Sequence, residues 1–437
     1  MSGKGQNLYR QAKKLIPGGT QLLSKRPEFL LPELWPSYYR HAKGIEVHDL
    51  DGNTYLDMSH NGVGTCILGA ADPDVNKAVH EAIDNGTMST LNCPEEVELA
   101  ELLVELHPWS DMVRFARCGG EAMAIATRIA RASTGKDIIA FCGYHGWHDW
   151  YISANLADES TLDGHLLPGL SPAGVPRALK GTALPFKYNK LEELEKIVRE
   201  QDGKLAAIIM EPIRSSEPEP GFLEGVRKIA DKTGAVLIFD EVTSGFRVCA
   251  GGIHLQLGVN PDIVVFAKSI SNGYPMAAIV GTEKVMNAAQ DSFISSTYWT
   301  ERVGTVAALA TIKKFRDQKV NEHLIHIGTR IQEGWKKAAE ATGLAIHVDG
   351  IPPLSHFTVK TDDPPAAHTF FVQSMLERGY LSGMVFYGTF AHTDKHVDDY
   401  LAAVTEVFAD LTKALEDGTL TAKLKGPTIH TGFHRLS

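Results

Sequence analysis

The sequence predicts an α/β protein, with a large domain built on a mostly parallel central sheet flanked by helices and a smaller α+β domain formed by the N-terminal arm and the C-terminal segment. Two β-branched apolar runs, 235–239 and 263–267, are bounded by Gly, Asp or Pro, which is typical of strands buried on both faces of a parallel sheet. Strand and helix patterns alternate across residues 112–281, and such alternation indicates helices on the faces of that sheet. After residue 320, helical patterns surround short strands, so a second domain is expected there.

The first segment, residues 1–60, is predicted to be an arm followed by a hairpin. A helical pattern near the start stops at a Pro-Gly-Gly sequence, and an irregular proline-rich region follows it. Apolar and polar residues then alternate in 45–50 and 53–58, on either side of an Asp-Gly pair. An Asp-Gly pair between alternating segments is the strongest short-range signal for a β-hairpin.

The large domain is expected to span residues 61–319. Helical patterns at 74–83 and 95–106 precede its alternating part. The predicted strands are 112–116, 137–141, 205–210, 235–239 and 263–267. Because each strand ends on a polar or glycine-rich turn, all five turns are expected at one edge of the sheet.

The small C-terminal domain is expected to span residues 320–437. Its predicted helices are 321–341, 366–378 and 394–415, and its short strands lie near 345–348 and 356–359.

The composition of the chain indicates which classes of molecule the protein binds. The chain of 437 residues has a formal net charge of -10, which argues against a nucleic-acid or anionic-membrane surface and favours small-molecule partners. The polar N-terminus carries no signal-peptide pattern and no apolar run could span a bilayer, so a cytoplasmic protein is expected. The five cysteines are widely spaced and form no Cys-x-x-Cys, so neither a disulfide framework nor a metal site is predicted.

Two charged residues follow the two apolar runs directly. Asp240 comes after the first run and Lys268 after the second, so both are expected at carboxyl ends of strands, where α/β sheets bind ligands. A lysine that forms a Schiff base with an aldehyde cofactor, and an acid that holds the pyridinium nitrogen of that cofactor, need this arrangement. A solvated lysine and an ordinary salt-bridged aspartate are the structural alternatives.

A turn with few side chains lies between the first strand and the next helix. Cys118, Gly119 and Gly120 form it, and its free backbone N–H groups at a helix N-terminus could bind a phosphate. A plain tight turn explains the two glycines equally well.

Tyr144 is interpreted as a stacking partner for a planar ring or as a core residue. The nearby His145 and His148 invite a metal site, but they lack an acidic or cysteine partner in a known pattern.

The segments 237–247 and 268–275 together resemble the signature of class III pyridoxal-phosphate aminotransferases. Within that class the chain is most similar to glutamate-1-semialdehyde aminomutase and its relatives, as judged by 17–19, 51–57 and 144–146. The resemblance extends over almost the whole chain. It implies the fold-type I architecture, pyridoxal 5'-phosphate bound in residues 61–319, and a homodimer with shared active sites.

The resemblance also assigns roles at the cofactor ring. Lys268 forms the Schiff base and then moves a proton between the substrate Cα and the cofactor. Asp240 pairs with the pyridine nitrogen, while Val242 and Tyr144 cover the two faces of the ring.

Five further residues follow from the resemblance. The backbone of Gly119 and Gly120 binds the phosphate, with Cys118 in the same turn. Thr297 reaches the phosphate of the neighbouring subunit, and Glu211, from a Glu-Pro pair, lies near the cofactor.

The predicted function is an aminotransferase that moves an amino group between an amino donor and a carbonyl acceptor. The alternative is an intramolecular aminomutase, because the chain resembles those enzymes too, although residues 298–302 replace their small Ser-Gly-Asn-Pro segment with bulkier residues. An alternative of another class is a non-catalytic nucleotide-binding module. That module needs a Gly-x-Gly-x-x-Gly or Walker-type loop after the first strand, and residues 118–121 supply neither.

Overall fold

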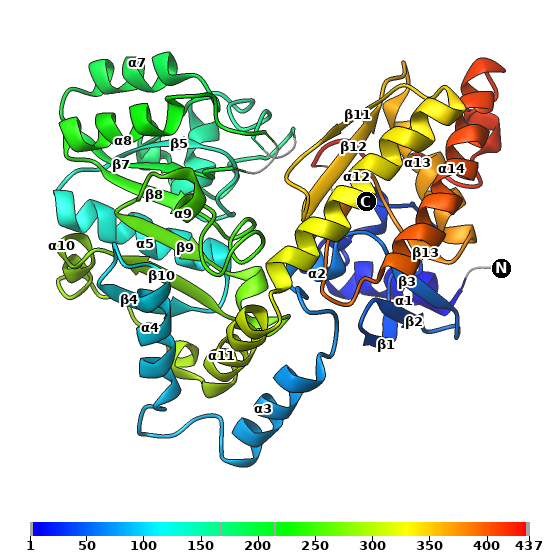
Figure 1. Ribbon diagram of the computed structural model, residues 1–437. Coiled ribbons are helices and arrows are strands. Elements are labelled where there is room, and N and C mark those ends of the chain that lie inside the picture. The colour runs from blue at the N-terminus through cyan, green and yellow to red at the C-terminus, as the bar shows by residue number, and fades with distance from the viewer. Residues whose placement is uncertain (1–2, 166–167, 214–215, 434–437) are drawn as a thin grey trace. The chain divides into compact units, whose positions relative to one another are not determined.

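The computed structural model describes residues 3–165, 168–213 and 216–433. The chain forms two compact units (Figure 1): the sheet unit, Pro73–Asn321, and the arm unit, Met1–Asp72 with Glu322–Ser437. The prediction of a smaller α+β part built from both ends of the chain is confirmed. None of the helices among the described residues is long and apolar enough to cross a membrane.

The sheet unit is built on a seven-stranded sheet with the order β4-β10-β9-β8-β7-β5-β6. Its strands are β4 (Met112–Ala116), β5 (Ile138–Cys142), β6 (Ala183–Pro185), β7 (Leu205–Met210), β8 (Val236–Asp240), β9 (Ile263–Phe266) and β10 (Ala277–Gly281). Strand β10 is antiparallel to both β4 and β9, and the other pairs are parallel. The five predicted strands therefore all point the same way, and their carboxyl ends share one edge. The short β6 and the antiparallel β10 were not among the predicted strands.

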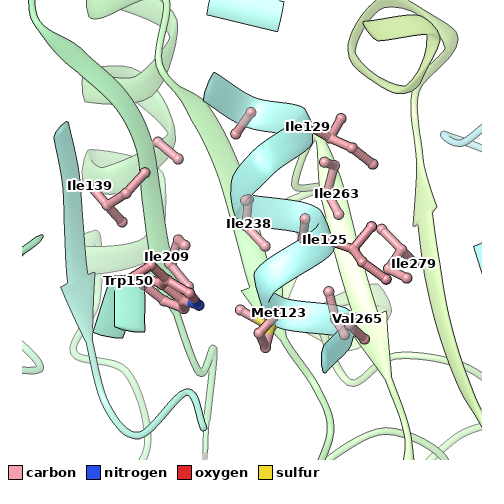
Figure 2. Packing of buried hydrophobic residues seen from close by; sticks show 14 of the residues in the cluster. Met123, Ile125, Ile129, Ile139, Trp150, Ile209, Ile238, Ile263, Val265 and Ile279 are labelled. Carbon is pink, nitrogen blue, oxygen red and sulfur yellow. The ribbon is translucent and has the colours of Figure 1, made fainter. Parts of the chain in front are cut away.

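Helix α5 (Gly119–Thr134) packs across one face of this sheet. Figure 2 shows Ile125 and Ile129 of this helix against Ile238 of β8 and Ile263 of β9, all of them buried. Each isoleucine side chain removed from water in this way contributes about 1.5–3 kcal/mol. The helix ends at Gly135, whose φ of 66° is left-handed, the usual conformation after a helix C-terminus.

The opposite face carries helices α7 (Leu191–Gln201) and α8 (Phe222–Thr233), which pack on each other and on β5, β7 and β8 (Figure 1). With both faces covered, the strands are continuous apolar runs, as in parallel sheets generally. The remaining helices of this unit are α3 (Pro73–Asp84), α4 (Glu95–Leu106), α6 (Asp149–Ile152), α9 (His254–Leu257), α10 (Glu283–Met286) and α11 (Arg302–Asp317).

The arm unit contains two small sheets. The first has the order β1-β2-β3-β13 and the second the order β11-β12-β14. Their strands are β1 (Tyr39–Lys43), β2 (Glu46–Asp49), β3 (Thr54–Asp57), β11 (Ile346–Asp349), β12 (Leu354–Val359), β13 (Tyr380–Leu381) and β14 (Val385–Tyr387). The predicted hairpin is β2–β3, and the parallel pairing of β3 with β13 joins the N-terminal arm to the C-terminal segment.

Five helices among the described residues are associated with this unit. They are α1 (Lys4–Leu15), α2 (Asn61–Gly64), α12 (Val320–Thr342), α13 (Pro364–Glu377) and α14 (Asp394–Glu416). Buried apolar side chains of α12, α13 and α14 form a second core around the fully buried Trp335.

Candidate active site

The residues predicted at strand ends lie at the carboxyl edge of the seven-stranded sheet. Asp240 is the last residue of β8, Glu211 directly follows β7, and Lys268 follows β9 after one intervening residue. Gly119 opens α5 shortly after β4. Because β7, β8 and β9 are neighbours in register, a carboxylate, an amine and a helix N-terminus are gathered at one edge.

Lys268 begins a short 3-10 turn, Lys268–Ser271, and is half-buried. Its Nζ donates a hydrogen bond to Oγ1 of Thr243 at 2.9 Å. The φ of Lys268 is 48°, and a left-handed conformation in a residue other than glycine costs on the order of 1–3 kcal/mol and concentrates at functional sites. The backbone therefore holds this lysine in a conformation that the surrounding fold enforces.

The carboxylate of Asp240 is fixed through both of its oxygens. Oδ2 lies 2.8 Å from Nδ1 of His145, and Oδ1 accepts the backbone N–H of Val242 at 3.0 Å. The other ring nitrogen of His145 lies 3.0 Å from the carbonyl oxygen of Cys142. A carbonyl can only accept, so this second nitrogen carries a proton and donates it to Cys142.

The role of His145 was missed by the sequence interpretation, which weighed it only as a metal ligand together with His148. Its position directly after Tyr144, at the end of a strand, was the available signal. Among the described residues, no group of three or more His, Cys, Asp or Glu side chains could hold a metal ion.

The glycine turn is shaped by close approaches that exclude side chains. A Cβ atom on Gly119 would lie 2.8 Å from Cγ1 of Val242, and one on Gly146 would lie 2.8 Å from Cα of Gly120. Cys118 precedes the helix in an extended conformation, is exposed, and caps no N–H with its side chain. The turn thus leaves the N-terminal N–H groups of a 16-residue helix without a side-chain cap from Cys118, which suits a phosphate.

Replacing Gly119 with alanine is expected to destabilise the protein by about 1–3 kcal/mol, the usual cost of overpacking a filled site. Urea unfolding of the apoprotein measures this cost. Adding Val242→Ala in the same chain should restore most of the loss, because it removes the atoms that the new Cβ meets. Gly164→Ala is the control, since a Cβ there meets nothing within 4 Å. Unchanged stability of Gly119→Ala would contradict the packing seen at the turn.

Tyr144 and Val242 are half-buried and pack against the core beneath α5. The ring of Tyr144 meets that of Tyr151 edge-on, with centroids 5.9 Å apart. Glu211 is buried and close to Gly143, where a Cβ would lie 2.9 Å from Oε2 of the glutamate. Glu211 and Gly143 line a cavity of about 550 Å³ at the ends of β5 and β7. The structure therefore places all three predicted residues at the same edge as Lys268.

Thr297 differs from the other predicted residues in being exposed. It opens the 3-10 turn Thr297–Thr300. Two apolar side chains near it in the sequence are exposed as well, Phe293 by 87% and Tyr298 by 68%.

A buried hydrogen-bond network lies directly behind Asp240. The carboxylate of Glu241, which is fully buried, accepts hydrogen bonds from the backbone N–H groups of Ile253 and His254 and lies 2.6 Å from Nδ1 of His254. Trp109 donates its indole N–H to Nε2 of His254 at 2.9 Å. Since Nε2 accepts, Nδ1 carries the proton that His254 donates to the glutamate. These residues were not predicted, because their contacts join segments far apart in the chain.

His107 stacks on His254 with ring centroids 5.6 Å apart. Its Nδ1 donates to the carbonyl of Leu103 at 2.7 Å, and its Nε2 accepts the N–H of Gly252 at 3.1 Å. Burial lowers the pKa of His107 from 6.5 to about 4. The folded protein thus keeps this ring neutral at pH values where the unfolded chain binds a proton.

The free energy of unfolding is expected to fall as the pH drops from about 6.5 towards 4, because the unfolded state binds the proton of His107 first. At pH 5 the loss from His107 alone is about 2 kcal/mol, because each unit of difference between its folded and unfolded pKa values is worth about 1.36 kcal/mol. Urea unfolding at pH 7.5 and pH 5 measures it. A His107→Gln variant, although less stable, should lose less between the two pH values, and an equal loss in both proteins would contradict the assignment.

Comparison with known proteins decides the family. Residues 33–404 match the family model described as aminotransferase class-III. The chain belongs to the class III aminotransferases. The match covers the edge with Asp240 and Lys268 and most of the arm unit as well.

Two relatives among characterised proteins align with nearly the whole chain. The 3-aminobutyryl-CoA aminotransferase of Cloacimonas acidaminovorans (strain Evry) is 32% identical over 425 residues, covering 94% of this chain and 98% of the relative. The glutamate-1-semialdehyde 2,1-aminomutase of Roseiflexus castenholzii (strain DSM 13941 / HLO8) is 33% identical over 439 residues, covering 95% and 99%.

Solved structures show the same fold. The PLP internal aldimine form of the FumI protein of Sphingopyxis sp. MTA144 superposes with a TM-score of 0.85 at 26% identity, covering 97% of this chain and 99% of that one. An omega-transaminase from Sphaerobacter thermophilus gives a TM-score of 0.82 at 25% identity, covering 95% and 98%. The predicted fold-type I architecture and family are confirmed.

Proposed function

We propose that this class III enzyme is a pyridoxal-phosphate-dependent aminotransferase that moves an amino group between a small-molecule amino donor and a carbonyl acceptor. One observation carries the proposal: neighbouring strands β8 and β9 deliver Asp240 and Lys268 to the edge where α5 begins. An acid, an amine and an anion-binding helix end are the three groups that this cofactor requires.

The residues present fit the cofactor. When bound, pyridoxal phosphate supplies an aldehyde that condenses with amines and a ring that withdraws electrons from bonds at the substrate Cα. Lys268 would supply the amine that holds the aldehyde and carries a proton. Asp240, oriented by His145 at 2.8 Å, keeps the ring nitrogen protonated by charge pairing.

The other predicted residues take positions around this pair. Tyr144 and Val242 are assigned to the two faces of the ring. The backbone N–H groups of Gly119 and Gly120 bind the phosphate, in the turn that Cys118 begins.

Glu211 is assigned to the neighbourhood of the cofactor. It lines the cavity of about 550 Å³ at the ends of β5 and β7, in the same unit as Lys268.

The active enzyme is proposed to be a homodimer in which Thr297 reaches the phosphate bound by the second subunit. Exposed apolar side chains lie near this threonine in the sequence, with Phe293 exposed by 87% and Tyr298 by 68%. The hydroxyl of Thr300 lies 3.9 Å from Sδ of Met88, and Met88 is itself 42% exposed. Exposed apolar side chains of this size are frequent at protein interfaces.

A cytoplasmic location is proposed with this function. All five cysteines are free thiols in the structure, as is usual for proteins of a reducing compartment.

An intramolecular aminomutase is the second candidate, because the 33% identity to the Roseiflexus aminomutase is as high as that to the aminotransferase relative. The two functions use the same site and differ in whether the amino group leaves with a second molecule.

Borohydride reduction of the holoenzyme, followed by peptide mapping, tests the proposal. The reduced pyridoxyl group is expected on Lys268, and its recovery on any other residue would overturn the assignment. Incubation with an amino donor and an added keto acid then separates the two candidates. Net transfer to the keto acid identifies an aminotransferase, whereas isomerisation of a single compound identifies an aminomutase.

A further inference from the structure

The hydroxyl of Thr243 accepts a hydrogen bond from the amine of Lys268. The Nζ–Oγ1 distance is 2.9 Å, and Thr243 is buried, with 6% of its surface exposed. Lys268 changes its bonding state during the proposed reaction, so a buried hydroxyl beside it can stabilise one of these states more than the other.

The turn that carries Thr243 is fixed on several sides. The N–H of Val242 is bound by Asp240, and the N–H of Gly245 is bound by the carbonyl of Glu241 at 2.9 Å. Ser269, the neighbour of Lys268, donates its hydroxyl to the carbonyl of Gly245 at 2.6 Å. The lysine turn and the aspartate turn are thus tied together twice, once through Ser269 and once through Lys268 itself. Thr243 can therefore receive the amine without any rearrangement of the backbone.

We propose that Thr243 is a positioning residue that receives the ammonium group of Lys268 whenever an incoming amine displaces this lysine from the cofactor. The inference rests on the proposed function. In the displacement, the C=N bond to Nζ breaks and a C=N bond to the incoming nitrogen forms. With methylammonium as the incoming amine, two protons pass from its nitrogen to Nζ, so Lys268 leaves as –NH₃⁺ and no oxidant or reductant is needed. This is the protonation state that donates to Oγ1 of Thr243.

Thr243 therefore favours the displaced state over the bound one. In the displaced state the ammonium has a buried acceptor at 2.9 Å, whereas a lysine held by the cofactor has only one N–H to donate. Hydrogen bonds to charged groups are the stronger ones. Removing the acceptor should make displacement about 10- to 100-fold less favourable, which is the range expected for the loss of a charged hydrogen bond.

Titration of the holoenzyme with methylamine, followed by the absorbance of the cofactor, measures this equilibrium without knowledge of the substrate. For Thr243→Val, the apparent dissociation constant of methylamine is expected to rise about 10- to 100-fold. Thr243→Ser keeps a hydroxyl and should stay near the wild-type value. Thr311→Val is the matched control, because Thr311 is a buried threonine whose hydroxyl donates to the carbonyl of Ala307 inside α11.

Equal methylamine affinity in the wild type and Thr243→Val overturns the inference. So does an equal loss in Thr311→Val, which would indicate a general packing effect. If Thr243→Val does not fold or load cofactor, Thr243→Ala removes the same hydroxyl with less crowding and gives the same comparison. Borohydride labelling of Lys268 in the wild type is scored separately, so a failure of the proposed function is distinguished from a failure of the role of Thr243.

Discussion

Replacing Lys268 with alanine is expected to lower the rate of amino transfer by about 10³-fold or more. The reason is that the same amine holds the cofactor and moves the proton, and proton transfer by a positioned side chain alone contributes about 10²- to 10⁴-fold. The rate of the half-reaction with donor is followed by the absorbance of the cofactor, and borohydride should no longer attach the cofactor to the protein.

The control for Lys268→Ala is a lysine elsewhere on the same sheet. Lys136 precedes β5 at the opposite edge and donates to the carbonyl of Thr233 at 2.9 Å, so Lys136→Ala removes a hydrogen-bonded lysine without touching the site. It should leave the rate of transfer and the borohydride label intact. If Lys268→Ala kept wild-type activity, or if Lys136→Ala lost activity as strongly, Lys268 would not be the anchoring residue.

The sequence was sufficient to predict the strands that are buried on both faces. The runs that became β7, β8 and β9 are continuous and apolar, because α5 covers one face and other helices cover the other. The three-residue β6 and the two-residue β13 are too short to have a pattern of their own. Each of these short strands forms because a neighbouring strand supplies backbone hydrogen-bond partners.

The site, too, could be predicted only in part from the sequence. Asp240, Lys268 and Gly119 could be predicted to lie together, because the end of a strand and the start of a helix are visible in the chain itself. His145 could not be paired with Asp240 from the sequence, since 95 positions separate them. Trp109 and His254 are 145 positions apart. Contacts of this kind depend on strand order, which periodicity does not specify, so the residues that support the site were found only in the structure.

Changing Asp240 to asparagine is expected to lower the rate of transfer by about 10- to 10³-fold. An opposite charge within about 4–6 Å shifts a pKa by about 1–3 units, and the neutral amide no longer keeps the pyridine nitrogen protonated. The shape of the side chain is retained, so cofactor loading should persist. The pH dependence of the cofactor absorbance is the spectroscopic measurement, and the half-reaction rate is the kinetic one.

Asp262→Asn is the matched control, because Asp262 is a carboxylate at the other end of β9 that accepts hydrogen bonds from Arg227 and from the N–H of Leu237. It should cost stability but leave the absorbance and the rate unchanged. Comparable rate losses at both positions would show that Asp240 acts through folding alone.

The contribution of His145 is then isolated by a double-mutant cycle with Asp240. If the histidine acts only by holding the carboxylate, at the 2.8 Å seen between Nδ1 and Oδ2, then His145→Leu should reduce the rate about 10-fold in the wild-type background, the effect of about 1.4 kcal/mol. In the Asp240→Asn background the same change should have a much smaller effect, because the charge that it supports is already gone. Additive losses would mean that His145 contributes independently of Asp240. Coupled losses would show that the ring nitrogen of the cofactor is governed by a buried pair rather than by the aspartate alone.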